Sequence, residues 1–106
     1  MHPFLNIADR AARMAGKTIL DGLKRLDRIR MQEKQDNRGV VTEIDLKAES
    51  IIIDTIREAY PRHGILAEES NPIDGEGYIW IIDPLDGTSN YIHDFPHFAV
   101  SIAIKN

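Results

Sequence analysis

Two carboxylates, Asp83 and Asp86, stand three residues apart in the segment Trp-Ile-Ile-Asp-Pro-Leu-Asp-Gly-Thr-Ser-Asn at residues 80–90. Carboxylate oxygens are the ligands that Mg²⁺ prefers in proteins. The Gly-Thr-Ser sequence at 87–89 is well suited to open a helix, and free backbone N–H groups at a helix start bind anions. Metal ligands beside phosphate-binding amides form the layout of metal-assisted phosphate chemistry. The segment therefore predicts a Mg²⁺-dependent phosphatase.

A third acid, Glu68, directly follows the short apolar run 65–67, just as Asp83 follows the apolar run 79–82. If these runs are neighbouring strands, Glu68, Asp83 and Asp86 lie at one rim of the sheet. Carboxylates within a few ångströms raise one another's pKa, and a bound cation relieves that repulsion. The alternative is that Asp-Pro and Asp-Gly only form turns. The full segment and the upstream Glu-Glu-Ser favour a metal site over turns alone.

The composition of the chain excludes several classes of site and of protein. The chain has 106 residues, a formal net charge of −4 and no cysteine, which excludes disulfides, thiolate metal sites and a cysteine nucleophile. The acidic balance argues against nucleic acid as the main ligand. Charged residues interrupt residues 1–15, so this stretch lacks the apolar core of a signal peptide, and no segment is apolar enough to span a bilayer. We expect a cytoplasmic protein.

Two long helices are expected from apolar residues at helical spacing. The first covers residues 3–26, and the second begins at an N-cap, Thr42, and ends before Pro61. Between them, alternation at 29–32 predicts a short strand.

Three further strands are expected at 65–67, 78–82 and 98–104, with a turn-rich loop at 71–77. The fold class is then α+β, with the two helices packed in a layer on an antiparallel sheet. The strand at 98–104 has apolar residues on both faces, and such a strand is normally interior to a sheet because an apolar edge promotes aggregation. We therefore expect this chain to belong to a larger protein.

At this point the motifs resemble a known family. Residues 80–93 are similar to the signature of the inositol monophosphatases, members of the lithium-sensitive, Mg²⁺-dependent sugar phosphatase superfamily. Residues 66–70 (Leu-Ala-Glu-Glu-Ser) resemble that family's Gly-Glu-Glu-Ser element, and residues 41–45 (Val-Thr-Glu-Ile-Asp) its Val-Thr-x-x-Asp element. Residues 1–13 and 95–103 are similar to the bacterial SuhB-type branch.

The resemblance implies two Mg²⁺ ions. Glu68, Asp83 and the backbone carbonyl of Leu85 would hold the first, and Asp83 and Asp86 the second.

The resemblance also implies the residues that act on the substrate. Thr88, with Asp45 behind it, would orient the attacking water, and Glu68 is counted with these two as catalytic. Amides at 87–89 would bind phosphate oxygens. The implied substrate-binding residues are Glu68, Leu85, Asp86, Gly87, Thr88 and Ser89.

Some of these residues have simpler interpretations. Asp45 stands three residues after Thr42, where an acid can complete a helix cap. Lys34 falls where the family has a lysine near the metals, but an isolated lysine is most often solvated. Glu69 is interpreted as a supporting or structural residue rather than a ligand.

The implied activity is hydrolysis of inositol monophosphate or a similar small polyol phosphate. Fructose-1,6-bisphosphatase and 3′-phosphoadenosine nucleotidase activities are the rivals within the superfamily. A rival of another class is a regulatory module of ribosomal RNA transcription complexes, with RNA polymerase or an elongation factor as partner, because the SuhB-type branch is also linked to them. A third alternative is an inactive truncated product.

Residues 1–106 are expected to be the N-terminal portion of a metal-dependent sugar phosphatase domain. The family's C-terminal half supplies a further metal-binding aspartate and sugar contacts. We therefore expect the 106 residues alone to be inactive. For the full-length parent, a homodimer is one of the oligomeric states that the sequence leaves open.

Overall fold

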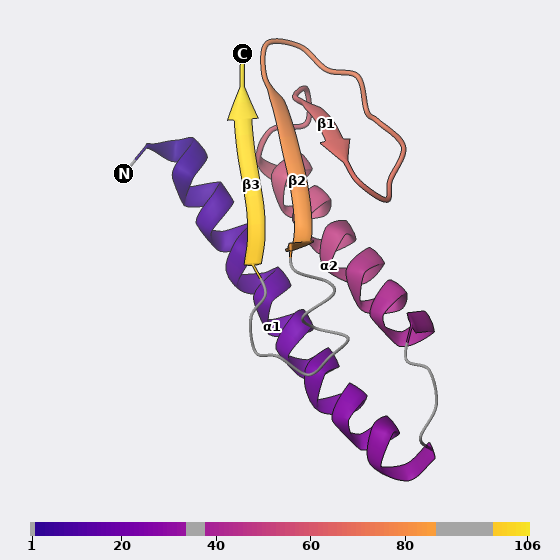
Figure 1. Cartoon of the computed structure of the whole chain (residues 1–106). Helices are drawn as coiled ribbons and strands as arrows, with labels where there is room; N and C mark the ends of the chain where they lie inside the picture. The colour runs from indigo at the N-terminus through magenta and orange to yellow at the C-terminus, as the bar shows by residue number, and fades with distance from the viewer. Residues whose placement is uncertain (1, 34–37, 87–98) are drawn as a thin grey trace.

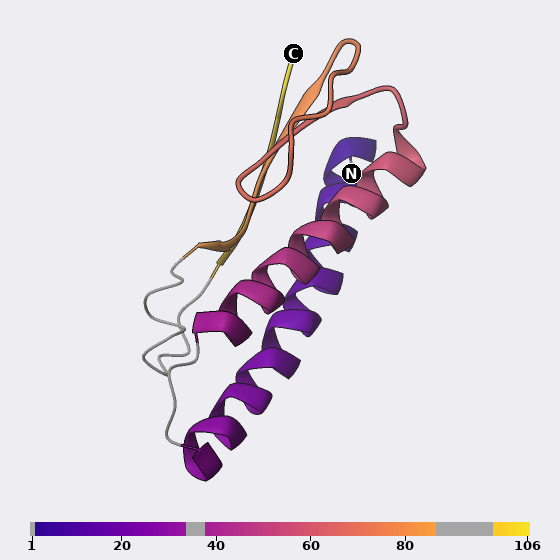
Figure 2. The ribbon, with the colours of Figure 1, turned by 90° about the vertical axis from the view of Figure 1, so that its right-hand side faces the viewer.

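A computed structural model describes residues 2–33, 38–86 and 99–106, with side chains described except at Leu23, 26–42, 84–86 and Ala99. The elements are α1 (Pro3–Glu33), α2 (Arg38–Ala59), β1 (Gly64–Ala67), β2 (Ile79–Asp86) and β3 (Ala99–Lys105) (Figure 1). The two helices lie side by side and cover one face of a three-stranded sheet, which gives two layers (Figure 2). The C-terminal half of α1 runs past the ends of the strands (Figure 1). The expected α+β class is confirmed.

Small residues allow the two helices to approach closely. On α1, Ala11, Ala15 and Ile19 recur every fourth residue and are completely buried. Their partners on α2 also recur at intervals of four. Each helix therefore places one apolar stripe against the sheet and against the other helix. The buried α2 stripe consists of Ile44, Ala48, Ile52 and Ile56.

Both helices are longer than the sequence pattern predicts. The strand expected at 29–32 is wrong, because α1 continues through these residues to Glu33. Arginine, methionine, glutamine and glutamate there are good helix formers, and extending an existing helix is easier than starting a new element. The N-cap expected at Thr42 is also wrong, since α2 already begins at Arg38. The predicted end before Pro61 is confirmed, with Ala59 the last helical residue.

The sheet is mixed rather than antiparallel throughout. β1 pairs with β2 in parallel, and β2 pairs with β3 antiparallel. The parallel pair arises because the chain after β1 first returns along the far edge of β1, where Ile65 and Ile73 exchange two backbone hydrogen bonds of 2.9 Å. The chain then crosses over to form β2 on the other edge, with Gly64 opposite Ile79.

A glycine permits this tight return. A Cβ atom on Gly75 would lie 2.1 Å from the backbone nitrogen of Gly64, so a side chain at this position would collide with the start of β1. Gly77 has a φ of 80°, which is the left-handed region that favours glycine. The loop predicted at 71–77 is therefore confirmed.

β3 alternates between its two faces. Val100, Ile102 and Ile104 are partly buried against the core, whereas Ser101 and Lys105 on the other face are exposed. In the described ranges no helix is both long enough and apolar enough to cross a membrane.

Trp80 is the largest completely buried side chain and joins the two layers. Its indole Nε1–H donates a hydrogen bond to Nδ1 of His63 at 3.0 Å. The rings of Tyr60 and His63 stack at a centroid distance of 4.8 Å, and Phe4 packs edge-on against both Tyr60 and Trp80. The aromatic cluster connects the start of α1 to the end of α2 and the start of β2.

We expect His63→Phe to lower the free energy of unfolding by about 1–3 kcal/mol, because the buried indole N–H loses its acceptor while the stacked ring is kept. The same substitution in a Trp80→Phe background, which has no N–H to satisfy, should cost about 1 kcal/mol less. Urea denaturation of the four variants measures this coupling. Equal costs in both backgrounds would show that the hydrogen bond contributes nothing to stability.

Candidate functional site

The parallel pairing of β1 and β2 brings two acids together. The register places Ala67 opposite Ile82, so the next residues, Glu68 and Asp83, emerge at the same edge of the sheet. The negative charge of Asp83 is the main cause that raises the pKa of Glu68, with burial and a hydrogen bond to the Asp83 carboxyl adding to it. The structure thus places Glu68 beside Asp83, as the two strand ends predict.

β2 does not end at Ile82, as the sequence predicts, but continues to Asp86. Asp83 lies opposite Ser101 and Asp86 opposite Ala99, so three steps along β2 match two along β3. This extra residue is a β-bulge, which also accommodates a proline that cannot donate to the ladder. The bulge pairs positions 83 and 86 with residues on one face of β3. The side chain of Asp86 lies outside the described part.

α2 adds a third acid to this edge. Burial is the main cause that raises the pKa of Asp45, and the charges of Glu69, Glu68, Glu49 and Asp83 add to it in that order, to give a value of about 6. Among the residues that the structure describes, the buried Oδ1 atom of Asp45 has no hydrogen-bond partner. Asp45 therefore shares the electrostatic environment of Glu68 and Asp83, and the alternative that it completes a helix cap is wrong, because α2 already begins at Arg38.

Glu49, one turn after Asp45, was not predicted from the sequence. Its side chain is completely buried. Oε2 accepts a hydrogen bond from the backbone N–H of Glu69 at 3.1 Å, while Oε1 has no partner within the described part of the chain. The sequence holds a signal for this burial, because Glu49 precedes Ile52 and Ile56 by three and seven residues and so shares their buried helix face.

Several predicted site residues cannot be placed. Lys34, Gly87, Thr88 and Ser89 lie outside the described residues. For Leu85 the structure describes the backbone, as part of β2, but not the side chain. The side chain of Glu69 is exposed, and its described contact is made by its backbone amide.

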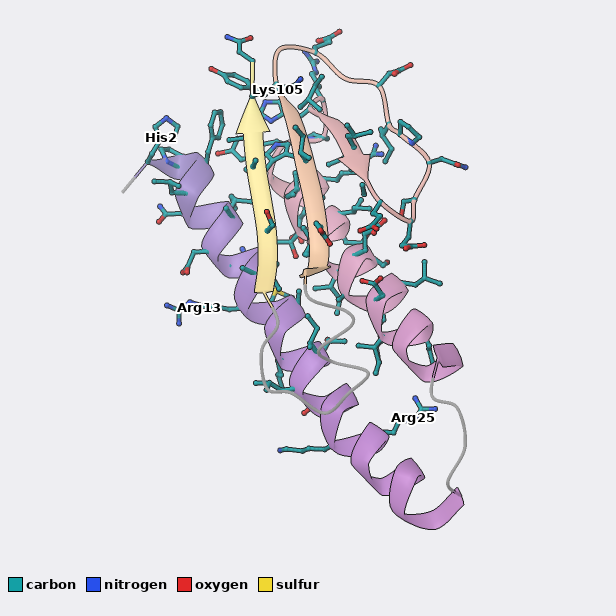
Figure 3. The ribbon with its side chains drawn as sticks, in the orientation of Figure 1. His2, Arg13, Arg25 and Lys105 are labelled. Carbon is teal, nitrogen blue, oxygen red and sulfur yellow. The ribbon has the colours of Figure 1, made fainter. Side chains whose placement is uncertain are left out.

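The charges that shift the pKa of Asp45 and Glu68 are all negative. The described ion pairs lie elsewhere: Arg13 binds Asp9 on α1 at 3.0 Å, and Arg25 reaches from α1 to Glu43 at 3.3 Å (Figure 3). Both pairs are largely exposed, and such pairs contribute little to stability. The repulsion among the acids is therefore not balanced by these arginines.

A bound cation would remove this repulsion. Among the side chains that the structure describes, no three acids or histidines are close enough together to hold a metal ion, and Asp86 is not among them. The donors that are present are carboxylate oxygens, and the buried oxygens of Asp45 and Glu49 noted above lack partners. This donor chemistry fits Mg²⁺, a hard ion that prefers oxygen ligands.

The sequence model of the inositol monophosphatase family matches residues 1–105, so the chain belongs to that family. Among curated relatives, it is 54% identical over 109 residues to Nus factor SuhB of Pseudomonas aeruginosa and 50% identical over 107 residues to Nus factor SuhB of Escherichia coli K12. Each match covers 99% of this chain and 40% of the relative. The chain thus spans about two fifths of the length of these relatives.

Solved structures agree with this assignment. The extragenic suppressor protein suhB of Bartonella henselae superposes with a TM-score of 0.80 at 36% identity, covering 97% of this chain and 39% of that one. An inositol monophosphatase from Anabaena (Nostoc) superposes with a TM-score of 0.76 at 39% identity, covering 95% and 34%. The layered arrangement of helices and sheet is therefore that of the family.

Asp45→Asn should stabilise the metal-free chain at pH 7. The raised pKa of Asp45 means that the folded state binds its proton more tightly than the unfolded state does. Its favourable contribution is complete below about pH 4 and is lost as the pH rises through about 6. We expect Asp45→Asn to gain about 1–2 kcal/mol over wild type at pH 7 and nothing at pH 4.

Urea denaturation in EDTA at the two pH values measures this difference. Asp54→Asn, at an exposed position of the same helix, is the control and should show no such pH-dependent gain. A less stable Asp45→Asn variant at pH 7 would mean that the Asp45 charge is favourable in the fold.

Proposed function

We propose that the protein carrying this chain is a Mg²⁺-dependent phosphomonoesterase that hydrolyses inositol monophosphate or a similar small polyol phosphate. One observation carries the proposal: Glu68 and Asp83 meet where the parallel pairing of β1 with β2 ends, inside a cluster of acids that repel one another when no cation is bound. Membership of the inositol monophosphatase family supports the reaction class.

In this proposal Glu68, Asp83 and the carbonyl of Leu85 hold one Mg²⁺, and Asp83 and Asp86 hold a second. When bound, Mg²⁺ supplies Lewis acidity, which acidifies the attacking water and neutralises charge on the phosphoryl group. The bulge in β2 supports a shared role for positions 83 and 86, because without the extra residue two positions three apart would face opposite sides of the strand.

The remaining residues orient the reactants. The hydroxyl oxygen of Thr88 accepts a hydrogen bond from the attacking water. The Thr88 hydroxyl is in turn hydrogen-bonded to Asp45, whose Oδ1 has no partner in the described residues and is available as an acceptor. Backbone amides of Gly87, Thr88 and Ser89 hold the phosphate oxygens. Such positioning lowers the barrier because water and phosphate no longer have to find their relative orientation.

The metal assignment predicts that Asp83→Asn abolishes Mn²⁺ binding by this chain, because Asp83 is the ligand common to both proposed sites. Mn²⁺ serves as a probe that takes oxygen ligands as Mg²⁺ does. Isothermal titration calorimetry at pH 7 measures the affinity. The matched control is Asp54→Asn, which removes an exposed acid from α2 and should leave the affinity unchanged. Unchanged Mn²⁺ affinity in Asp83→Asn would refute the assignment.

The catalytic assignment is tested in the whole protein. Asp86→Asn should lower turnover of myo-inositol 1-phosphate about 100-fold or more, whereas Glu69→Gln should lower it no more than about tenfold, because only the first removes a proposed ligand. Thr88→Ala should lower kcat with little change in Mn²⁺ affinity, since its proposed task is to orient water. Equal losses in Asp86→Asn and Glu69→Gln would mean that the acids have been assigned wrongly.

A second candidate function is a role in transcription complexes. Curated relatives at 50–54% identity carry the name Nus factor SuhB, which favours RNA polymerase or an elongation factor as a partner. We propose that such binding uses a surface other than the acidic edge. Purified RNA polymerase should then bind the whole protein equally well in wild type and Asp83→Asn by biolayer interferometry. Loss of binding in the variant would place the partner at the metal site.

A further inference from the structure

Glu49 joins the two layers of the fold beside the candidate metal ligands. It is one of the largest completely buried side chains, yet it is acidic. From α2 it reaches the end of β1, where Oε2 accepts the N–H of Glu69 at 3.1 Å. The other residue that is classed as polar and buried in the described chain is Thr55, whose hydroxyl bonds within the helix layer, to the carbonyl of Ile51 and the sulfur of Met14. Glu49 instead bonds from the helix layer to the end of β1.

The hydrogen bond that Glu49 accepts from the Glu69 amide constrains the preceding residue, Glu68. The N–H of Glu69 belongs to the peptide plane that also contains the carbonyl of Glu68, and a peptide plane rotates as a unit. Holding this N–H in place fixes the backbone dihedral ψ of Glu68. β1 ends at Ala67, so Glu68 is the first residue that the sheet no longer constrains. Glu49 supplies the constraint that the strand ladder does not.

A purely structural explanation accounts poorly for a carboxylate at this position. Oε1 is buried and finds no partner among the described side chains and backbone groups, and a buried polar atom without a partner is unfavourable. Glu49 also adds its negative charge to those that raise the pKa of Asp45 and Glu68. An apolar side chain of similar volume would fill the core without either penalty. What it could not do is hold the Glu68–Glu69 peptide.

We propose that Glu49 is a positioning residue: its hydrogen bond to the Glu69 amide orients Glu68 beside Asp83 for cation binding. The cation part of this inference rests on the proposed function. The geometric part, that Glu49 fixes the end of β1, stands without it. Glu49 itself is not a ligand in this proposal, so its hydrogen-bonding capacity matters and its charge does not.

The geometric part is tested without metal. In EDTA, amide hydrogen exchange of Glu69 measured by NMR should be about tenfold faster or more in Glu49→Ala than in wild type, after normalisation to the buried amide of Ile65. Glu49→Gln keeps an acceptor oxygen and should retain the protection. Glu58→Ala, at an exposed position of the same helix, is the matched control and should change nothing. Unchanged exchange in Glu49→Ala would overturn the proposal.

The cation part is tested by Mn²⁺ calorimetry on the same variants at a temperature where each is folded. Glu49→Ala should weaken Mn²⁺ binding about 10–100-fold, and Glu49→Gln should restore the affinity to within about threefold of wild type. A residue with only a structural role would lower the melting temperature of Glu49→Ala without changing its Mn²⁺ affinity. Equal weakening in both variants would show that the charge matters, and it would also overturn the proposal.

The two failures are distinguishable. If the wild-type chain and the whole protein bind no Mn²⁺, the proposed function fails, and the exchange of the Glu69 amide alone decides whether Glu49 fixes the end of β1. If Mn²⁺ binds and Asp83→Asn abolishes it, the proposed function stands, and the Glu49 variants then decide the positioning role.

Discussion

Repulsion among carboxylates is the constraint on which the site depends. Asp45, Glu68, Glu69 and Asp83 come from three different elements, and each acts unfavourably on at least one of the others. Charges of one sign separate unless the fold holds them or a counter-ion joins them. The scaffold must therefore supply enough stability to keep these acids together when no cation is bound.

That stability comes from the helix pair and the aromatic cluster. Ala11 and Ala15 let α1 and α2 pack closely, and α2 presents Asp45 and Glu49, which directly follow Ile44 and Ala48 of its buried stripe, to the end of the sheet. Trp80 fixes β2 against both helices, two residues before the strand reaches Ile82 and then Asp83. The site thus lies directly beyond buried core residues of β2, Trp80 and Ile82. An arrangement of this kind offsets unfavourable electrostatics with burial elsewhere.

The sequence predicted the parts of the fold that follow from local pattern. Apolar spacing identified both helices and the three described strands, and strand ends identified Glu68 and Asp83 as neighbours. The prediction from sequence failed where the local pattern was ambiguous, and where the structure depends on contacts between residues distant in the chain. Ile29 and Met31 suggested a strand because two alternating residues fit either structure, and the parallel pairing of β1 and β2 depends on the return of the chain past Ile65, which no local signal encodes.

Two features of the site could not be predicted from the sequence pattern, for physical reasons. The bulge between Asp83 and Asp86 exists only relative to β3, so a single strand cannot reveal it. The spacing of Glu49 to Ile52 and Ile56 places it on their apolar face, but its hydrogen bond to the Glu69 amide becomes evident only once α2 is packed against the sheet. The resemblance to inositol monophosphatases supplied roles for Thr88 and the amides at 87–89, which lie outside the described residues and remain predictions.

The central claim is that the acids at the end of β1 and β2 are held together in order to bind a cation. The most direct measurement is the number of protons released when Mn²⁺ binds, obtained by calorimetry at pH 6 in two buffers of different ionisation enthalpy. Because repulsion and burial raise the pKa of Asp45 and Glu68, a cation should lower both and release a measurable fraction of a proton at pH 6, falling to none at pH 8. Mn²⁺ binding with no proton release at pH 6 would contradict the claim, because it would place the ion away from these acids.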